Sequence, residues 1–287
     1  MFCVQLAIEC GRRGGECLDQ QIGSGGAVRY TGWIVVLMLL VGLSSASDLA
    51  RERRIALELE DAILIGSPLR LSANGSEFFA IHAESAAAQL LGGVILLHGS
   101  GANPNWHDVV FPLRAQLPES GWETLSIQLP IAAADVPEGS DQALIPEAFP
   151  RILAALEFFR QRGVENVALV GHSLGAQMGL EYLANDPTQG VKALVAVGLS
   201  ARRDIPVTGT LLALQKVKLP ILDIYGSRDI EPVLATVNAR AIEARRADNP
   251  DYRQLEVPGA DHFFTGLDDQ LVQRVHAWLQ KTVSSRM

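Results

Sequence analysis

Cysteine is nearly absent from this sequence of 287 residues: the three cysteines, Cys3, Cys10 and Cys17, all lie near its start. Residues 48–287 therefore offer no disulfide framework, no thiol nucleophile and no thiolate ligand for a metal ion. They also lack the His-x-x-x-His and Glu-x-x-His spacings with which a helix binds a metal. We expect neither a metal nor another cofactor, and a fold that depends on its hydrophobic core.

An excess of positive charge is also missing. Lysine and arginine number 24 against 32 acidic residues, which gives a formal net charge of −8 and a pI near 5.3. Proteins that bind nucleic acid or anionic membranes usually carry a basic surface. We therefore expect no nucleic-acid partner, and a small molecule or a polymer as substrate.

A hydrophobic run long enough to cross a membrane is missing as well. Residues 33–43 are apolar but fall well short of the roughly 20 residues that a transmembrane helix needs. Arg29 precedes this run, and the small residues of 44–47 follow it, which is typical of a secretory signal peptide. We expect export to the periplasm with cleavage near Ala46 or Ser47, and no permanent span in the mature chain. The alternative is that residues 33–46 stay as an inner-membrane anchor.

Residues 1–27 show no apolar periodicity of a strand or a helix. Our hypothesis is that they are a mis-assigned start and that translation begins near Val28. The expected organisation is an N-terminal extension and signal peptide over residues 1–47, followed by one domain over residues 48–287.

From residue 75 onward, β-rich runs alternate with stretches of helical periodicity. Strands are expected at 75–84, 92–101, 122–130, 166–172, 192–200, 219–227 and 253–259, and helices at 107–118, 142–163, 174–185, 232–247 and 267–282. This alternation predicts an α/β fold with a mostly parallel sheet and helices on both faces. The loops 131–141 and 201–210 follow strand ends, where such sheets bind ligands.

The run "NVALVGHSLGAQMGL" (166–180) places Ser173 between an expected strand and an expected helix. A chain that turns from strand to helix over one residue is sharply bent, and Gly171 and Gly175 allow the two elements to approach closely. The turn exposes the serine hydroxyl beside the backbone N–H groups of a helix N-terminus. The pattern favours a nucleophilic serine over a simple helix N-cap.

This stretch resembles the nucleophile elbow of the α/β-hydrolases, and the resemblance extends over most of residues 75–282. It implies a triad in the family's order, with Asp229 after "LDIYGS" as the acid and His262 in "EVPGADHFF" as the base. Asp204 remains an alternative acid. The resemblance also implies an oxyanion hole made by the backbone N–H groups of Ser100, in "LLHGSG", and Leu174. His98 and His172 are interpreted as structural parts of their turns.

A narrower resemblance covers "RERRIALELEDAILIGSPLRL" and "VILLHGSGANPNWHDVVFPLRAQLPESGWETLSIQLP". These segments look like a family of uncharacterised α/β-hydrolase-like proteins that proteobacteria export. The resemblance supports the fold and a location in the cell envelope.

Together these patterns predict a periplasmic serine hydrolase acting on carboxylic esters or thioesters through an acyl-enzyme. The short connection between residues 200 and 219 leaves no room for a large lid domain. Four aromatic residues are candidates for an acyl pocket: Trp106, Phe111, Phe263 and Phe264. Two alternatives stay open, a non-catalytic envelope binding protein with the same fold, and a peptidase or polymer depolymerase.

Overall fold

A computed structural model describes residues 47–134, 140–185, 190–201 and 209–283. The expected signal peptide, its alternative as an anchor, the suspected false start and Asp204 lie outside these residues. Within the described part, no helix combines the length and the apolar character needed to span a membrane.

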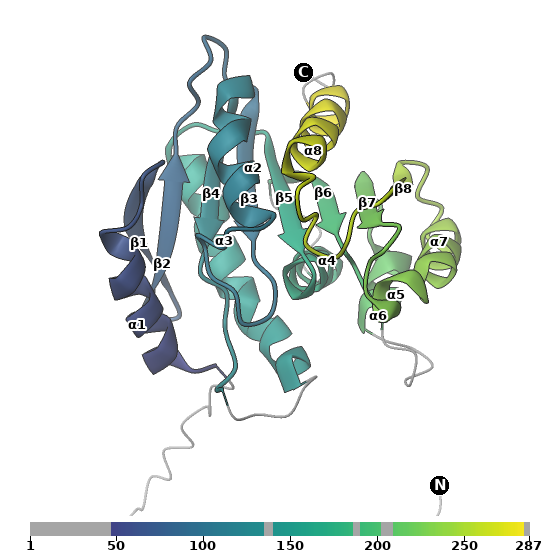
Figure 1. Cartoon of the computed structure of the whole chain (residues 1–287), viewed down its shortest axis with the longest axis horizontal. Helices are drawn as coiled ribbons and strands as arrows, with labels where there is room; N and C mark the ends of the chain where they lie inside the picture. The colour runs from purple at the N-terminus through teal and green to yellow at the C-terminus, as the bar shows by residue number, and fades with distance from the viewer. Residues whose placement is uncertain (1–46, 135–139, 186–189, 202–208, 284–287) are drawn as a thin grey trace, which may run out of the picture. The chain divides into compact units, whose positions relative to one another are not determined.

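The fold is built on one eight-stranded sheet in the order β1-β2-β4-β3-β5-β6-β7-β8 (Figure 1). The strands from β3 to β8 run parallel, whereas β2 is antiparallel to both β1 and β4. Their bounds are β1 Ser67–Ala73, β2 Ser76–Ala83, β3 Gly92–Leu97, β4 Trp122–Ile127, β5 Val167–His172, β6 Val191–Val197, β7 Ile221–Gly226 and β8 Tyr252–Val257. The mostly parallel sheet that the alternating pattern predicts is confirmed.

Helices cover both faces of this sheet (Figure 1). On one face lie α1 Leu49–Glu60, α2 Val110–Gln116 and α8 Asp268–Thr282. On the other face lie α3 Ile145–Gln161, α4 Leu174–Asn185 and α5 Gly209–Lys216, with α7 Val237–Arg246 packed against α5. Three short helices complete the described part, η1 Leu117–Ser120, η2 Ser140–Leu144 and α6 Glu231–Leu234.

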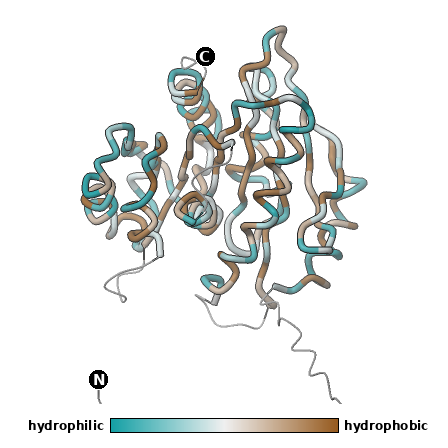
Figure 2. Tube along the Cα trace, turned by 180° about the vertical axis from the view of Figure 1, so that it is seen from behind, coloured by the Kyte–Doolittle hydropathy of each residue, from teal (hydrophilic) through white to brown (hydrophobic). Residues whose placement is uncertain are grey.

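The core has two layers, one on each side of the sheet. Along β3, Ile95 and Leu97 pack into the layer beneath α3 and α4, while Val94 and Leu96 pack beneath α2 and α8. Such strands are buried on both sides, so they are hydrophobic at every position. Figure 2 shows this as hydrophobic colour along the central strands, with hydrophilic colour on the outer helices.

The sequence interpretation misses three elements, namely α1, β1 and α5, the last of which begins at Gly209 inside the expected loop 201–210. In the described part of the β6–β7 connection, α5 is the only helix, and there is no separate lid domain.

Candidate active site

The turn from β5 to α4 holds Ser173 in a strained backbone conformation. Its φ angle is +54°, in the left-handed region that costs a residue with a side chain about 1 kcal/mol or more. A Cβ atom at Gly171 would lie 2.5 Å from the carbonyl oxygen of Gly175. A Cβ at Gly175 would in turn overlap the carbonyl oxygens of Leu97 and His98. The two glycines therefore allow the tight turn that the sequence predicts.

Asp229 and His262 meet at the ends of β7 and β8. His262 Nδ1 and Asp229 Oδ1 are 2.6 Å apart, and both residues are buried. The carboxylate also accepts hydrogen bonds from the backbone N–H groups of Ile230, at 2.8 Å, and Gly226, at 3.2 Å. Since a carboxylate can only accept, Nδ1–H of His262 is the donor in the 2.6 Å bond, which is the arrangement that a base acting through Nε2 requires.

Ser173 and His262 both contact the C-terminal end of β6. The N–H of Ser173 donates to the carbonyl of Val197 at 2.8 Å. The next residue, Gly198, has a φ angle of +61°, and a Cβ there would lie 2.9 Å from Cε1 of His262. Among the described contacts the Ser173 hydroxyl makes no hydrogen bond with the His262 ring. In ligand-free sites this bond is often longer than in the reacting complex.

The loop after β3 passes directly beside Ser173. A Cβ at Gly99 would lie 3.4 Å from Cβ of Ser173, so the next residue, Ser100, is at the edge of the site. Leu174 is the first residue of α4. The two backbone N–H groups expected to form an oxyanion hole therefore belong to segments that adjoin Ser173.

His98 fixes the orientation of this loop. Its Nδ1–H donates to the carbonyl of Gly99 at 2.8 Å, and its Nε2 accepts from the N–H of Leu129 at 2.9 Å. Burial lowers the pKa of His98 to about 4, so the ring stays neutral. In a trans peptide the C=O and the following N–H point in opposite directions, so the bond to Gly99 also sets the direction of the Ser100 N–H.

His172 contacts His262 through a ring contact and a hydrogen bond to its backbone. Its Nε2–H donates to the backbone carbonyl of His262 at 2.9 Å, and the two ring centroids are 4.8 Å apart. Burial, and to a lesser extent the nearby His262, lower the pKa of His172 to about 4. This neutral ring is therefore a structural part of its turn, as the sequence predicts, and it also holds the backbone of a candidate base.

The four aromatic candidates for an acyl pocket separate in the structure. Phe263 is 40% exposed, and its ring centroid lies 5.2 Å from that of His262. Phe264 is fully buried in the core beneath α8, so the expectation that it lines a pocket is wrong. Trp106 packs against the same core, and Phe111 lies under the guanidinium of Arg114. Of these four, Phe263 is the one whose ring contacts a triad candidate among the described residues.

Sequence reasoning missed two residues near the site. Gly198 leaves room for the His262 ring, and the signal was a glycine at the end of an apolar strand, in "VAVGLS". Asp141 accepts a hydrogen bond from the hydroxyl of Ser100. No sequence signal links Ser100 and Asp141, because they are far apart in the chain.

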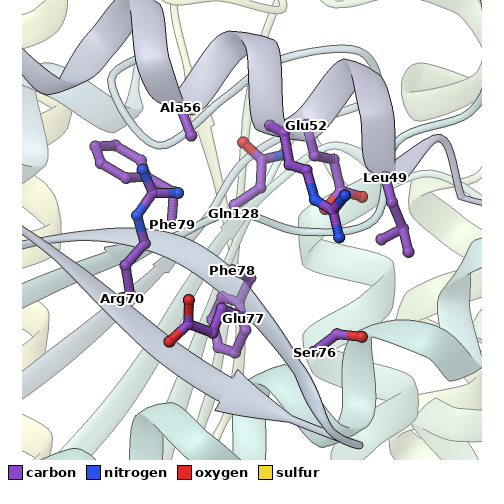
Figure 3. A pocket seen from close by; sticks show the side chains of 10 residues that line it. Leu49, Glu52, Ala56, Arg70, Ser76, Glu77, Phe78, Phe79 and Gln128 are labelled. Carbon is purple, nitrogen blue, oxygen red and sulfur yellow. The ribbon is translucent and has the colours of Figure 1, made fainter.

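The pocket in Figure 3 is a separate feature. It lies between α1 and the β1–β2 hairpin, and Glu52, Arg70 and Gln128 are among its lining residues. None of the candidate site residues lines it. Glu52 forms a buried ion pair with Arg151 at 2.8 Å, which is a structural use of its charge. Over the described residues, no group of three or more His, Cys, Asp or Glu side chains is placed to hold a metal ion.

Solved structures share this fold. The chain is similar to an α/β serine hydrolase homologue from Coxiella burnetii, with 17% identity and a TM-score of 0.58 over 75% of this chain and 98% of that one. A serine hydrolase without a lid from Xanthomonas campestris has 18% identity and a TM-score of 0.59 over 77% and 96%. A dienelactone hydrolase from Anabaena variabilis has 22% identity and a TM-score of 0.59 over 76% and 98%.

These similarities establish the α/β-hydrolase fold that the nucleophile-elbow resemblance implies. No curated protein matches the sequence. A family model described as "Protein of unknown function (DUF3530)" matches residues 50–150 and 134–281, which together span most of the chain. The chain therefore belongs to the DUF3530 family, and its fold is that of the α/β-hydrolase superfamily.

Proposed function

We propose that this protein is a serine hydrolase that cleaves carboxylic esters or thioesters with Ser173 as nucleophile, His262 as base and Asp229 as the acid that orients the base. One observation carries the proposal: a buried carboxylate is bonded at 2.6 Å to a histidine, and this histidine packs beside the same end of β6 that binds a serine in a strained strand-to-helix turn. A serine hydroxyl is a poor nucleophile at neutral pH without such a base, and the base needs its tautomer fixed.

In the proposed reaction, Nε2 of His262 takes the proton of the Ser173 hydroxyl as Oγ attacks the substrate carbonyl carbon. The N–H groups of Ser100 and Leu174 stabilise the resulting oxyanion, an effect worth on the order of 3 kcal/mol for each donor. The C–O or C–S bond then breaks, and the leaving group takes the proton from His262. Water, deprotonated by the same histidine, releases the acid from the acyl-enzyme and restores Ser173.

The proposed location is the periplasm, after cleavage of a signal peptide near Ala46 or Ser47, with residues 48–287 as a single domain. Retention of residues 33–46 as an inner-membrane anchor is the alternative. The pattern of one positive charge, a short apolar run and small residues supports export.

The test is covalent labelling of the purified protein with a fluorophosphonate, followed by intact-protein mass spectrometry. The proposal predicts one adduct, which is absent from Ser173→Ala, together with loss of ester hydrolysis in that variant. The circular dichroism spectrum of Ser173→Ala serves as the control for folding. A folded wild-type protein that gains no adduct would contradict the proposal and favour the non-catalytic binding protein.

A further inference from the structure

A carboxylate lies beside the proposed oxyanion hole. The hydroxyl of the exposed Ser100 side chain donates a hydrogen bond to Oδ2 of Asp141. Asp141 belongs to the short helix η2, which leads into α3. The residue whose backbone N–H we assign to the oxyanion hole is therefore one hydrogen bond away from a negative charge.

Among the described residues, no positively charged side chain pairs with Asp141. Its hydrogen-bond partner there is the hydroxyl of Ser100. The polar groups that follow along the same wall are neutral. Gln142 Nε2 donates to Gln177 Oε1 at 2.8 Å, and Gln177 Nε2 donates to Ser200 Oγ at 3.0 Å. Among the described residues of this group, Asp141 is therefore the one that carries a charge, and its side chain is partly exposed.

The His172 ring contacts both the loop that carries Ser100 and the backbone of His262. Its Nδ1 faces Gly99 of the oxyanion loop, and its Nε2 donates to the backbone of His262. A leaving group must reach His262 to take up a proton, so it lies on the side of Phe263. The acyl group has no such requirement, so we place it on the side of Ser100, whose hydroxyl is bonded to Asp141.

We propose, building on the serine hydrolase function proposed above, that Asp141 selects substrates by the charge of their acyl group. Neutral and cationic acyl groups are accepted, and acyl groups that carry a carboxylate are rejected. A carboxylate on the acyl group near Asp141 would be repelled by its like charge, and specificity arises from such repulsion as readily as from attraction.

The experiment uses p-nitrophenyl esters with matched acyl chains: neutral pentanoate, anionic hemiglutarate and cationic 4-(trimethylammonio)butanoate. The measured quantity is the ratio of kcat/KM for each charged ester to that for the neutral ester, so a general loss of activity cancels. Asp141→Asn should raise the anionic ratio and lower the cationic ratio, each about tenfold at low ionic strength. In the wild type, added salt should reduce both preferences because it screens the charge.

Two further variants keep the result interpretable. Ser100→Ala removes the hydrogen bond but keeps the carboxylate, so it should keep the wild-type ratios. Glu58→Gln, an exposed position on α1, makes the same change in net charge away from the site and should also keep them.

Unchanged ratios in Asp141→Asn, with the neutral ester still cleaved by the wild type, would overturn this inference and leave the proposed function intact. Loss of the preference in Ser100→Ala would also overturn it, because the hydrogen bond and not the charge would then set the ratios. A wild type that neither cleaves the neutral ester nor reacts with the fluorophosphonate would contradict the proposed function itself.

Discussion

At the scale of single residues, the candidate site depends on histidines with different tasks. His262 is bonded to a carboxylate, which suits a base. His98 and His172 are buried and neutral, and each bonds a backbone carbonyl of a segment that adjoins Ser173. In our proposal these two are positioning residues, because they act through the loops that carry the oxyanion donor and the base.

His172 provides a test of such positioning. His172→Phe keeps a flat ring but removes the Nε2–H that holds the carbonyl of His262, and we expect kcat to fall about tenfold with little change in KM. His172→Gln restores a donor and should recover part of the loss. Steady-state kinetics with a p-nitrophenyl ester measure both constants. Equal activity of the Phe and Gln variants would show that the hydrogen bond has no part in catalysis.

At the scale of elements, the C-terminal end of β6 is where a small backbone change should be most damaging. Gly198 has a positive φ angle, and a methyl group there would lie 2.9 Å from Cε1 of His262, well inside ordinary van der Waals contact. We expect Gly198→Ala to displace the imidazole and to lower the rate of fluorophosphonate labelling about a hundredfold.

The matched control is Gly163→Ala. Gly163 also has a positive φ angle, +74°, but a Cβ there meets nothing within 4 Å. Both substitutions carry the backbone cost of about 1 kcal/mol, which thermal unfolding will measure, and only Gly198→Ala should slow labelling. If the two variants label at the same rate, the space beside His262 is not what Gly198 provides.

The same elements show what the sequence can predict. Strands such as β3 and β5 are hydrophobic throughout because both faces are buried, so their positions are evident from the chain. Helix α1 is rich in charge and buries only Glu52 and Ala56, and β1 is an edge strand with mostly exposed side chains, so neither shows a strong pattern.

The candidate site also has residues that the sequence predicts and residues that it does not. Ser173, Asp229 and His262 follow strands in a recognisable order, so their neighbourhood could be predicted. The clearance at Gly198, the burial of Phe264 and the bond from Ser100 to Asp141 depend on tertiary contacts between distant segments. Local periodicity carries no information about such contacts.

At the scale of the whole molecule, the sheet gathers the site at one edge. Ser100 follows β3, Ser173 follows β5, Gly198 follows β6, Asp229 follows β7 and His262 follows β8. The carboxyl ends of parallel strands meet at one edge, which is where open α/β sheets place ligands. His98 and His172 hydrogen-bond the loops at this edge and are buried and neutral. We therefore expect that protonating them at acid pH destabilises the whole fold.

Burial lowers the pKa of both His98 and His172 to about 4, against 6.5 in an unfolded chain. Between these values the unfolded chain binds protons that the folded protein does not, so the free energy of unfolding rises with pH. The stability linked to these rings is complete above pH 6.5 and is lost as the pH falls toward 4. Each histidine contributes a slope of up to about 1.4 kcal/mol per pH unit, reached near the middle of this window.

Urea unfolding of the wild type and His172→Gln at several pH values between 4.5 and 6.5 measures this slope. The variant should lose one histidine's share, up to about 1.4 kcal/mol per pH unit at roughly pH 5.3, whatever its stability at neutral pH. Groups that titrate alike in both proteins, such as Glu52 with its raised pKa, cancel in the difference. If His172→Gln keeps the wild-type slope, the pKa of His172 is not lowered in the folded protein, and its ring gains a positive charge beside the proposed base within this pH range.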